Sequence, residues 1–258
     1  MAKKIGLALS GGGARGFAHV GVLKVFAKHG IRFDMIAGTS AGSIVGGALA
    51  AGMTVPEIET MARKARYSNM MRPSFSPRGL LSNAPMGRFL KQMLPVDRIE
   101  ETAVPFAAVA YDLKSGEEHV LENSGDLVFA IRASCSVPGL FVPLTDSSGR
   151  ILVDGGISSP LPTQIAREMG ADIVIAVDLL ACGGTYLTTP RTALGVALRS
   201  TFSLIRAASQ NQQYRADLVI EPAIAHLRPD QIGKCSELIA LGEAAAEERI
   251  DEILNLIR

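Results

Sequence analysis

The chain has 258 residues, of which 48% are hydrophobic, and it carries 26 Lys and Arg against 25 Asp and Glu. This length fits one large domain or two small ones, with enough apolar content for a core that needs neither disulfides nor metals. The formal net charge of +1 argues against a protein that binds nucleic acid through a broad basic face. Three cysteines without metal-binding spacing predict free thiols in a reducing compartment, namely Cys135, Cys182 and Cys235.

No segment of the sequence is typical of a secretion signal or a membrane span. The apolar run Ile5–Leu9 is too short for the hydrophobic part of a signal peptide. Residues 35–56 carry no charge, but five glycines dilute their hydropathy, so a transmembrane helix is not expected there. We therefore expect a soluble, cytoplasmic protein.

Strand and helix patterns alternate from the beginning of the chain. The apolar run over residues 4–9 predicts a buried strand that ends at Ser10 and three consecutive glycines. A second strand is expected over residues 33–37. Helices are predicted over residues 14–29, 41–51 and 56–65, the last with Pro56 in its favourable first turn.

Residues 67–85 interrupt this alternation with three prolines, four serines and no apolar period. They predict a long irregular loop, and loops of this length are usually functional or disordered. One interpretation is a lid over an acyl-chain groove, which would bring transient contact with a membrane surface. The other is a disordered insert, and the sequence leaves both open.

The alternation resumes after residue 85. Helices are expected over residues 86–94, 127–133, 162–169, 191–213 and 236–257. Strands are expected over residues 106–111, 118–121, 151–153, 172–177 and 217–220. This order predicts a single α/β domain over residues 1–258 with a mainly parallel central sheet.

Residues 38–42 read Gly-Thr-Ser-Ala-Gly, which fits the G-x-S-x-G pattern of a nucleophile elbow. The pattern stands between a predicted strand and a predicted helix, as that elbow requires. Glycines on both sides of Ser40 allow a sharp turn, and the helix N-terminus favours a developing anion at the serine side chain. The alternative is an ordinary strand-to-helix turn in which Ser40 only caps the helix.

Residues 11–16 read Gly-Gly-Gly-Ala-Arg-Gly and follow the first predicted strand. They fit the G-x-G-x-x-G fingerprint of dinucleotide-binding proteins, but a dinucleotide site also requires an acidic residue at the end of the second strand. Here the second strand ends in Gly-Thr-Ser, and Asp34 lies at its beginning. The other interpretation is an oxyanion hole, in which backbone N–H groups face the oxyanion formed when Ser40 attacks a carbonyl. A packing turn without a ligand is the third.

Asp154, followed by two glycines, ends a predicted strand and is expected at the carboxyl edge of the sheet. A base for Ser40 would be a histidine or a carboxylate. Three of the four histidines are not expected beside a strand-end turn: His29, His119 and His226. His19 follows the glycine loop, but one turn inside its helix, where a packed and hydrogen-bonded side chain is expected.

Taken together, these motifs resemble the patatin-like phospholipase family, whose members are serine acyl hydrolases. The family pattern is a glycine-rich loop with a basic residue, then G-x-S-x-G, then D-G-G or D-G-A, in the order found here. Residues 133–141 also resemble its A-S-x-x-x-P block. The resemblance covers about residues 4–181 and implies a three-layer α/β/α fold.

The resemblance implies a Ser–Asp dyad with Ser40 as nucleophile and Asp154 as general base. The amides of the oxyanion hole would be those of Gly11, Gly12 and Gly13. Arg15 would support this loop or a substrate phosphate, unless it is a solvated residue at the start of the helix. The implied activity is hydrolysis of a carboxylic ester of a lipid through an acyl-enzyme, of the phospholipase A, lysophospholipase or carboxylesterase type. No metal or organic cofactor is implied.

Two other functions remain open at this point: a nucleotide-binding regulator that uses residues 11–16, and a catalytically idle interaction protein on the same fold. Asp112 and Asp178 end apolar strands, and we expect them to cap turns or helices. Arg132 is expected at the surface or paired with a carboxylate. The sequence does not indicate the acyl chain, the head group or the oligomeric state.

Overall fold

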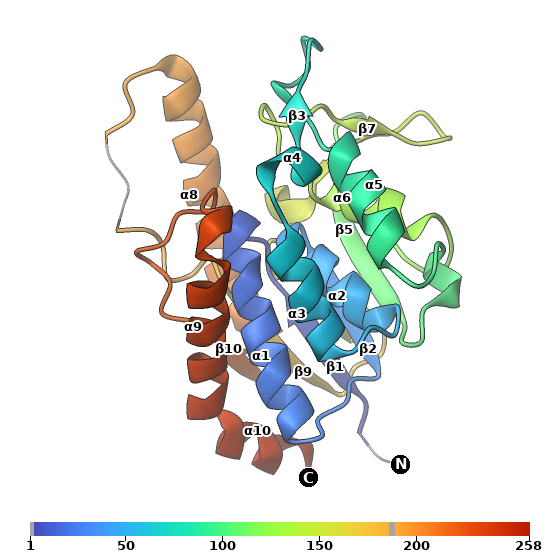
Figure 1. Cartoon of the computed structure of the whole chain (residues 1–258), viewed down its shortest axis with the longest axis vertical. Helices are drawn as coiled ribbons and strands as arrows, with labels where there is room; N and C mark the ends of the chain where they lie inside the picture. Colours follow the sequence, from blue (N-terminus) through green and yellow to red (C-terminus); the bar gives the residue numbers. More distant parts are fainter. Residues whose placement is uncertain (1–2, 186–188) are drawn as a thin grey trace.

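A central, mostly parallel sheet organises the computed structural model, which describes residues 3–185 and 189–258 (Figure 1). Its strands lie in the order β10-β9-β1-β2-β5-β8-β7, and β6 pairs with β5 off this path. The bounds are β1 Ile5–Leu9, β2 Met35–Thr39, β5 Phe106–Asp112, β6 Glu117–Leu121, β7 Leu144–Thr145, β8 Ile151–Asp154, β9 Ile173–Val177 and β10 Leu218–Ile220. Strands β10, β9, β1, β2 and β5 are parallel, whereas β6 and β8 are antiparallel to β5.

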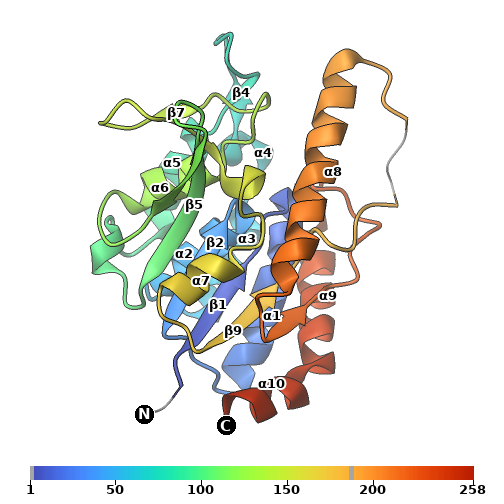
Figure 2. The same cartoon turned by 180° about the vertical axis from the view of Figure 1, so that it is seen from behind.

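Helices cover both faces of the sheet, so the predicted three-layer α/β/α arrangement is confirmed (Figure 2). On one face lie α1 Phe17–Lys28, α2 Ala41–Ala50, α3 Val55–Lys64, α5 Ala84–Met93, α6 Leu127–Ser134 and α9 Cys235–Glu248. On the other face lie α7 Thr163–Glu168 and α8 Ala193–Gln213. Short 3-10 turns (η1 Gly13–Gly16, η2 Ile99–Glu101, η3 Gly155–Ile157, η4 Ile232–Lys234) join these elements.

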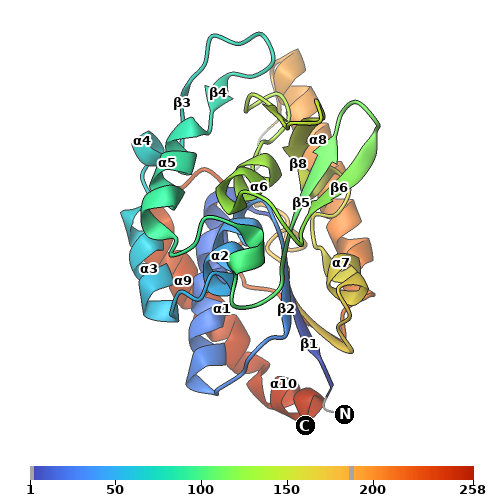
Figure 3. The same cartoon turned by 90° about the vertical axis from the view of Figure 1, so that its right-hand side faces the viewer.

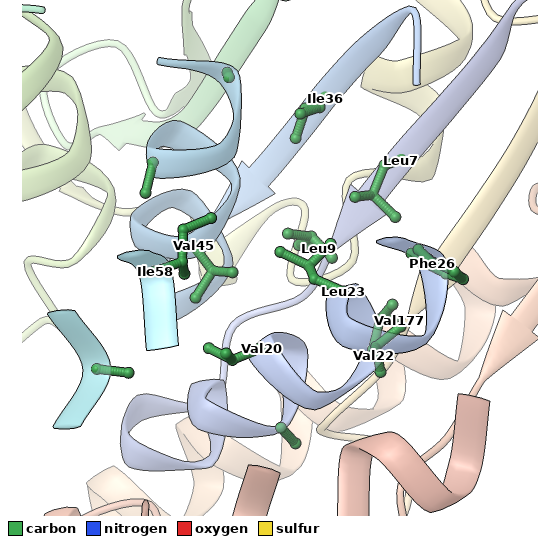
Figure 4. Close-up of a cluster of buried hydrophobic side chains, with 14 of the residues drawn as sticks. Leu7, Leu9, Val20, Val22, Leu23, Phe26, Ile36, Val45, Ile58 and Val177 are labelled. Atoms are coloured by element: carbon green, nitrogen blue, oxygen red, sulfur yellow. The ribbon is translucent and has the colours of Figure 1, made fainter. Parts of the chain in front are cut away.

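The central strands are apolar on both faces because both are covered, as is typical of parallel sheets. Leu7 and Leu9 of β1 point toward α1, where they meet Leu23 and Phe26 (Figure 4). Ala8, between them, belongs to the smaller core on the α7 side. Helix α1 also packs closely on α9: a Cβ on Gly21 would lie 1.9 Å from the Ile239 carbonyl oxygen.

The prediction of an irregular loop over residues 67–85 is wrong. The segment forms helix α4 Tyr67–Met70 and a hairpin of β3 Arg72–Pro73 and β4 Leu81–Ser82, and α5 already begins at Ala84. The Leu81 N–H donates to the Leu140 carbonyl, and the Leu81 carbonyl accepts from the Val142 N–H, both at 2.8 Å. This pairing with a segment about sixty residues away in the sequence holds the hairpin in place. No local sequence pattern predicts such a long-range pairing.

Other departures are smaller. The helix predicted over residues 236–257 is two helices, α9 and α10 Ile250–Ile257, separated at Arg249. Strand β7 was not predicted, since two residues show no period. Within residues 3–185 and 189–258, no helix combines the length and the apolar character needed to cross a bilayer.

Strand β5 explains how distant parts of the chain meet. Residues 108 and 109 pair with both β2 and β6, so β2 and β6 lie on opposite sides of β5. Residues 110–112 pair with both β6 and β8, so β8 lies on the same side as β2. Strand β2 ends opposite Val109 and β8 ends opposite Ala110. The two strands therefore run toward each other along one side of β5 and meet at their carboxyl ends (Figure 3).

Candidate active site

Ser40 occupies a sharp turn between β2, which ends at Thr39, and α2, which begins at Ala41. Its backbone has φ 52° and ψ −122°, a conformation that costs a residue with a side chain about 1–3 kcal/mol. The turn needs the glycines around it. A Cβ on Gly38 would lie 2.6 Å from the Gly42 carbonyl oxygen, and one on Gly42 would lie 2.1 Å from the Leu9 carbonyl oxygen. The turn at Ser40 thus has the strained strand–turn–helix geometry that the G-x-S-x-G pattern predicts.

Asp154 lies at the end of β8, where that strand meets β2. Strand β8 is antiparallel to β5, so it approaches the carboxyl edge of the sheet from the direction opposite to that of the parallel strands. Asp154 still arrives beside Ser40, because the register places it opposite Ala110, next to the pair of Val109 and Thr39. Register, rather than strand direction, brings these two residues together.

The Asp154 side chain is buried, with 6% exposure. Burial raises the pKa of its carboxyl group to about 6, against smaller opposing effects of the Ser40 hydroxyl and the Gly156 N–H. The Gly156 N–H donates to Oδ1 at 2.8 Å. In the part of the chain that the structure describes, no Lys, Arg or His forms an ion pair with Asp154. A buried, unpaired carboxylate next to a hydroxyl is suited to accept its proton near neutral pH.

The chain that follows Asp154 passes over β5 and the ends of β2 and β1, and so connects the three motifs. At Gly155 a Cβ would lie 2.3 Å from the Val109 carbonyl oxygen, so only glycine passes over β5 here. The Thr39 hydroxyl then donates to the Ser159 carbonyl at 2.6 Å. The Gly11 N–H donates to the Pro160 carbonyl at 3.0 Å.

The glycine loop lies directly beside Ser40. A Cβ on Gly11 would be 3.3 Å from the Ser40 Cβ. However, the bond to Pro160 occupies the Gly11 N–H, which corrects the expectation that this amide belongs to the oxyanion hole. Among the described residues, no hydrogen-bond partner is found for the N–H of Gly12 or Gly13. Gly13 has φ 58°, and a Cβ there would lie 2.5 Å from the Pro229 carbonyl oxygen.

Arg15 supports the glycine loop through hydrogen bonds to neighbouring backbone carbonyls. Its side chain is buried, with 3% exposure, so it is not a solvated residue at the start of the helix. Its guanidinium donates to three carbonyls, those of Leu227 at 2.8 Å, Leu179 at 3.2 Å and Ala225 at 3.5 Å. Arg15 therefore joins the glycine loop to the segments that follow β9 and β10.

His19 is also part of the scaffold. Its Nε2 lies 2.9 Å from the Ser10 carbonyl oxygen, and full burial lowers the pKa of the imidazole to about 4. The ring is therefore neutral near pH 7. The other histidines lie elsewhere, since His29 caps the end of α1, His119 is on β6, and His226 lies 3.3 Å from Glu237.

Two residues at the site had no role in the sequence analysis, although both belong to the block of residues 133–141. The buried Ser134 hydroxyl accepts the Ser40 N–H at 2.8 Å and so holds the strained turn. The Cys135 sulfur lies 3.9 Å from the Ser43 hydroxyl oxygen. Burial and the nearby Asp154 charge raise the pKa of this thiol well above its usual range, so it stays protonated.

The remaining candidates are structural. Asp112 and Asp178 cap backbone turns, as predicted: Asp112 accepts the Lys114 and Ile151 N–H groups at 3.0 Å, and Asp178 accepts the Leu180 N–H at 2.8 Å. Arg132 pairs with the Asn83 side-chain oxygen at 3.1 Å, not with a carboxylate. Over residues 3–185 and 189–258, no cluster of three or more His, Cys, Asp or Glu side chains could hold a metal ion.

Fold and site together define a class of α/β proteins in which a strand–serine–helix elbow lies beside a buried carboxylate at the edge of a central sheet. Within that class the chain belongs to the patatin-like phospholipase family, which matches residues 7–167. An NTE family protein of Mycobacterium tuberculosis is 38% identical over 179 residues. Human patatin-like phospholipase domain-containing protein 6 is 33% identical over 192 residues.

These matches cover much of this chain but less of the relatives. They span 68% and 72% of this chain, against 49% of the Mycobacterium protein and 14% of the human one. Two solved structures share the fold at low identity. VipD from Legionella pneumophila gives a TM-score of 0.58 at 14% identity, with 98% of this chain and 67% of VipD covered. A human cytosolic phospholipase A2 gives 0.51 at 12% identity, with 100% and 59% covered.

Proposed function

We propose that the protein is a serine acyl hydrolase that cleaves a carboxylic ester of a lipid, of the phospholipase A or lysophospholipase type. One observation carries the proposal: the buried Asp154 carboxyl group, with its pKa raised to about 6, faces the hydroxyl of Ser40 on a strained elbow. A carboxylate in this state matches the working range of a general base. The names of the relatives support a lipid ester as the substrate class.

In the proposed mechanism, the Ser40 oxygen bonds to the ester carbonyl carbon while its proton passes to Asp154. Negative charge then develops on the carbonyl oxygen, where the N–H groups of Gly12 and Gly13 stabilise it together with the N-terminus of α2. Collapse of this intermediate breaks the ester C–O bond, and the proton on Asp154 goes to the departing alcohol. Water attacks the acyl-enzyme next, and Asp154 takes its proton. As the bond between the acyl carbon and the Ser40 oxygen breaks, Asp154 returns this proton to Ser40, which releases the fatty acid.

The dinucleotide-binding alternative has less support. The Gly11 N–H is engaged by Pro160, and Gly13 lies against Pro229. Strand β2 ends in Gly38 and Thr39, with no carboxylate for a ribose hydroxyl.

A fluorophosphonate probe tests the proposal, because only an activated serine attacks phosphorus quickly. We expect one labelled serine in the parent and none in Ser40→Ala, with hydrolysis lost as well. Ser158→Ala is the matched control, since this serine lies near the site, at the end of η3, and bonds only weakly, to the Gly155 carbonyl at 3.4 Å. Labelling that survives Ser40→Ala would contradict the assignment. Nitrophenyl esters of graded length, assayed beside lysophospholipids, would then define the substrate.

A further inference from the structure

The charges of this chain are unevenly distributed along the sequence. No Asp or Glu occurs between Glu59 and Asp97 or between Asp178 and Asp217. These two acid-free stretches nevertheless contain eleven of the chain's 26 Lys and Arg. A protein with a net charge of only +1 thus concentrates positive charge in two segments, while the remainder is strongly acidic.

Parts of both stretches project from the same end of the molecule. We call residues 63–83, from the end of α3 through the β3–β4 hairpin, the hairpin prong. We call residues 189–206, the first part of α8 with the residues before it, the helix prong. Both prongs rise above the carboxyl edge of the sheet, where Ser40 lies, and they stand apart from each other (Figures 1 and 2).

The same two stretches carry the exposed apolar side chains. Eight large hydrophobic residues are exposed among the described residues, and all but Leu113 lie in the acid-free stretches. Six belong to the prongs: Tyr67, Phe75, Leu80, Val196, Phe202 and Leu204. Phe75, in the loop between β3 and β4, is fully exposed. Val196 and Leu204 are eight residues apart and so share a face of α8.

We propose that the two prongs dock the protein on an anionic lipid bilayer, with the active site between them facing the membrane. This inference rests on the proposed function, which requires a lipid substrate. Exposed Phe and Leu side chains insert at the boundary of head groups and acyl chains, while neighbouring Lys and Arg attract anionic head groups. Acidic residues, which such a surface would repel, are missing from both prongs.

Acidic residues do lie near this end, outside the prongs, among them Glu117 at the start of β6 and Glu221 after β10. Two others, Asp146 and Asp230, are each paired with an arginine. Asp146 pairs with Arg150 at 2.8 Å and Asp230 with Arg228 at 2.5 Å. The arginines partly offset the charges of Asp146 and Asp230 toward an approaching bilayer, and the prongs that project furthest carry no acidic residue.

Both prongs are attached firmly to the frame of the active site. In the lower half of α8, the Ser209 hydroxyl donates to Asp178 at 2.8 Å. The Gln212 side chain accepts the Leu161 N–H and donates to the Ser158 carbonyl, both at 2.9 Å, within the segment that follows Asp154. The hairpin prong is held by the backbone pairing of Leu81 described above. Docking of the prongs would thus place the dyad at a set depth relative to the bilayer.

The test is vesicle co-sedimentation with the Ser40→Ala protein, so that its outcome is independent of catalysis. Vesicles of phosphatidylcholine alone are compared with vesicles containing 30% phosphatidylglycerol, an amount chosen to give roughly physiological surface charge. We expect binding to the anionic vesicles, at least tenfold weaker binding to the neutral ones, and release at about 0.5 M salt as charges are screened.

Two prong variants and two control variants make the test specific. Each basic residue near an anionic surface contributes about fivefold to binding, so Arg72→Gln with Arg78→Gln should lower it about 25-fold. Phe75→Ser with Leu204→Ser should lower it by at least about tenfold, since apolar insertion is lost. Arg32→Gln, at the opposite end of the sheet, and Tyr214→Ser, at the far end of α8, should bind like the parent.

Equal binding to both kinds of vesicle, or equal binding by prong and control variants, would overturn the proposal. The proposal would also be overturned if the protein does not bind vesicles and instead forms a dimer, seen by light scattering, that the prong variants dissociate. In that case the prongs are an interface between two copies. Absence of hydrolysis with intact vesicle binding would instead count against the proposed function alone.

Discussion

Replacing Asp154 by Asn should abolish hydrolysis and at the same time stabilise the fold. Asn has the same shape, and its side-chain oxygen still accepts the Gly156 N–H. It offers no basic oxygen for the Ser40 proton, and loss of a general base costs about 10²–10⁴-fold in rate. The opposite effects on rate and stability follow from the same cause, which is a carboxylate buried without a countercharge.

The size of the stabilisation follows from the pKa of Asp154, which burial raises from 3.8 to about 6. An acid whose pKa is higher in the folded than in the unfolded state stabilises the fold only while it is protonated. That contribution is complete below about pH 4 and is lost as the pH rises through 6. A pKa raised by about two corresponds to about 3 kcal/mol of folding free energy. The free energy of unfolding of Asp154→Asn should therefore exceed that of the parent by up to this amount at pH 8, or several degrees in Tm, and by almost nothing at pH 4.

The assay is thermal unfolding of parent and variant, followed by circular dichroism from pH 4 to pH 8. Asp112→Asn is the control of opposite sign. Backbone hydrogen bonds, first from Lys114, lower the pKa of Asp112, so this carboxylate stabilises the fold at neutral pH and its replacement should destabilise it. In the parent, kcat/KM should rise with pH through about 6. A stability difference between Asp154→Asn and the parent that does not change with pH would refute the reasoning, as would activity of this variant within tenfold of the parent.

Two further predictions concern the glycine loop and His19. Gly13→Ala should lower kcat about 10²–10³-fold with a smaller change in KM, because the added Cβ meets the Pro229 carbonyl and displaces a proposed oxyanion donor. Gly30→Ala is the control, because Gly30 also has a positive φ but has open space around it. An unchanged kcat in Gly13→Ala would show that the loop takes no part in catalysis. His19→Gln should keep kcat within about tenfold while lowering stability by about 1–3 kcal/mol through the loss of its bond to Ser10. Because burial lowers the pKa of His19 to about 4, the cost of this substitution should appear above pH 6.5 and fade as the pH drops. A collapse of kcat in folded His19→Gln would replace the dyad with a histidine base.

Much of this protein could be predicted from short patterns in the sequence. The apolar run of β1 and the glycines after it specify a buried strand and a tight loop. The Gly-Thr-Ser-Ala-Gly run likewise specifies the elbow at Ser40. The order of strands and helices led to the α/β fold, which is confirmed. These features depend on residues that are neighbours in the chain, so the sequence determines them without knowledge of the partner segments.

Other features were decided by contacts between distant segments. The proximity of Asp154 to Ser40 depends on the antiparallel register of β8 on β5, which no local pattern in the sequence indicates. The Gly11 amide is engaged by Pro160, which no pattern within the glycine loop indicates. The hairpin over residues 72–82 is held by residues 140–142.

The physical reason is the range of the interactions involved. Backbone conformation and apolar period are properties of a few consecutive residues, and they can be read directly from the sequence. Strand register, the pairing of an amide and the pKa of a buried carboxylate depend on which groups another part of the chain brings within about 3–4 Å. For this protein, the sequence by itself determined the local turns and the nucleophile candidate Ser40. Only the tertiary structure determined how Asp154, the glycine loop and the projecting prongs lie around it.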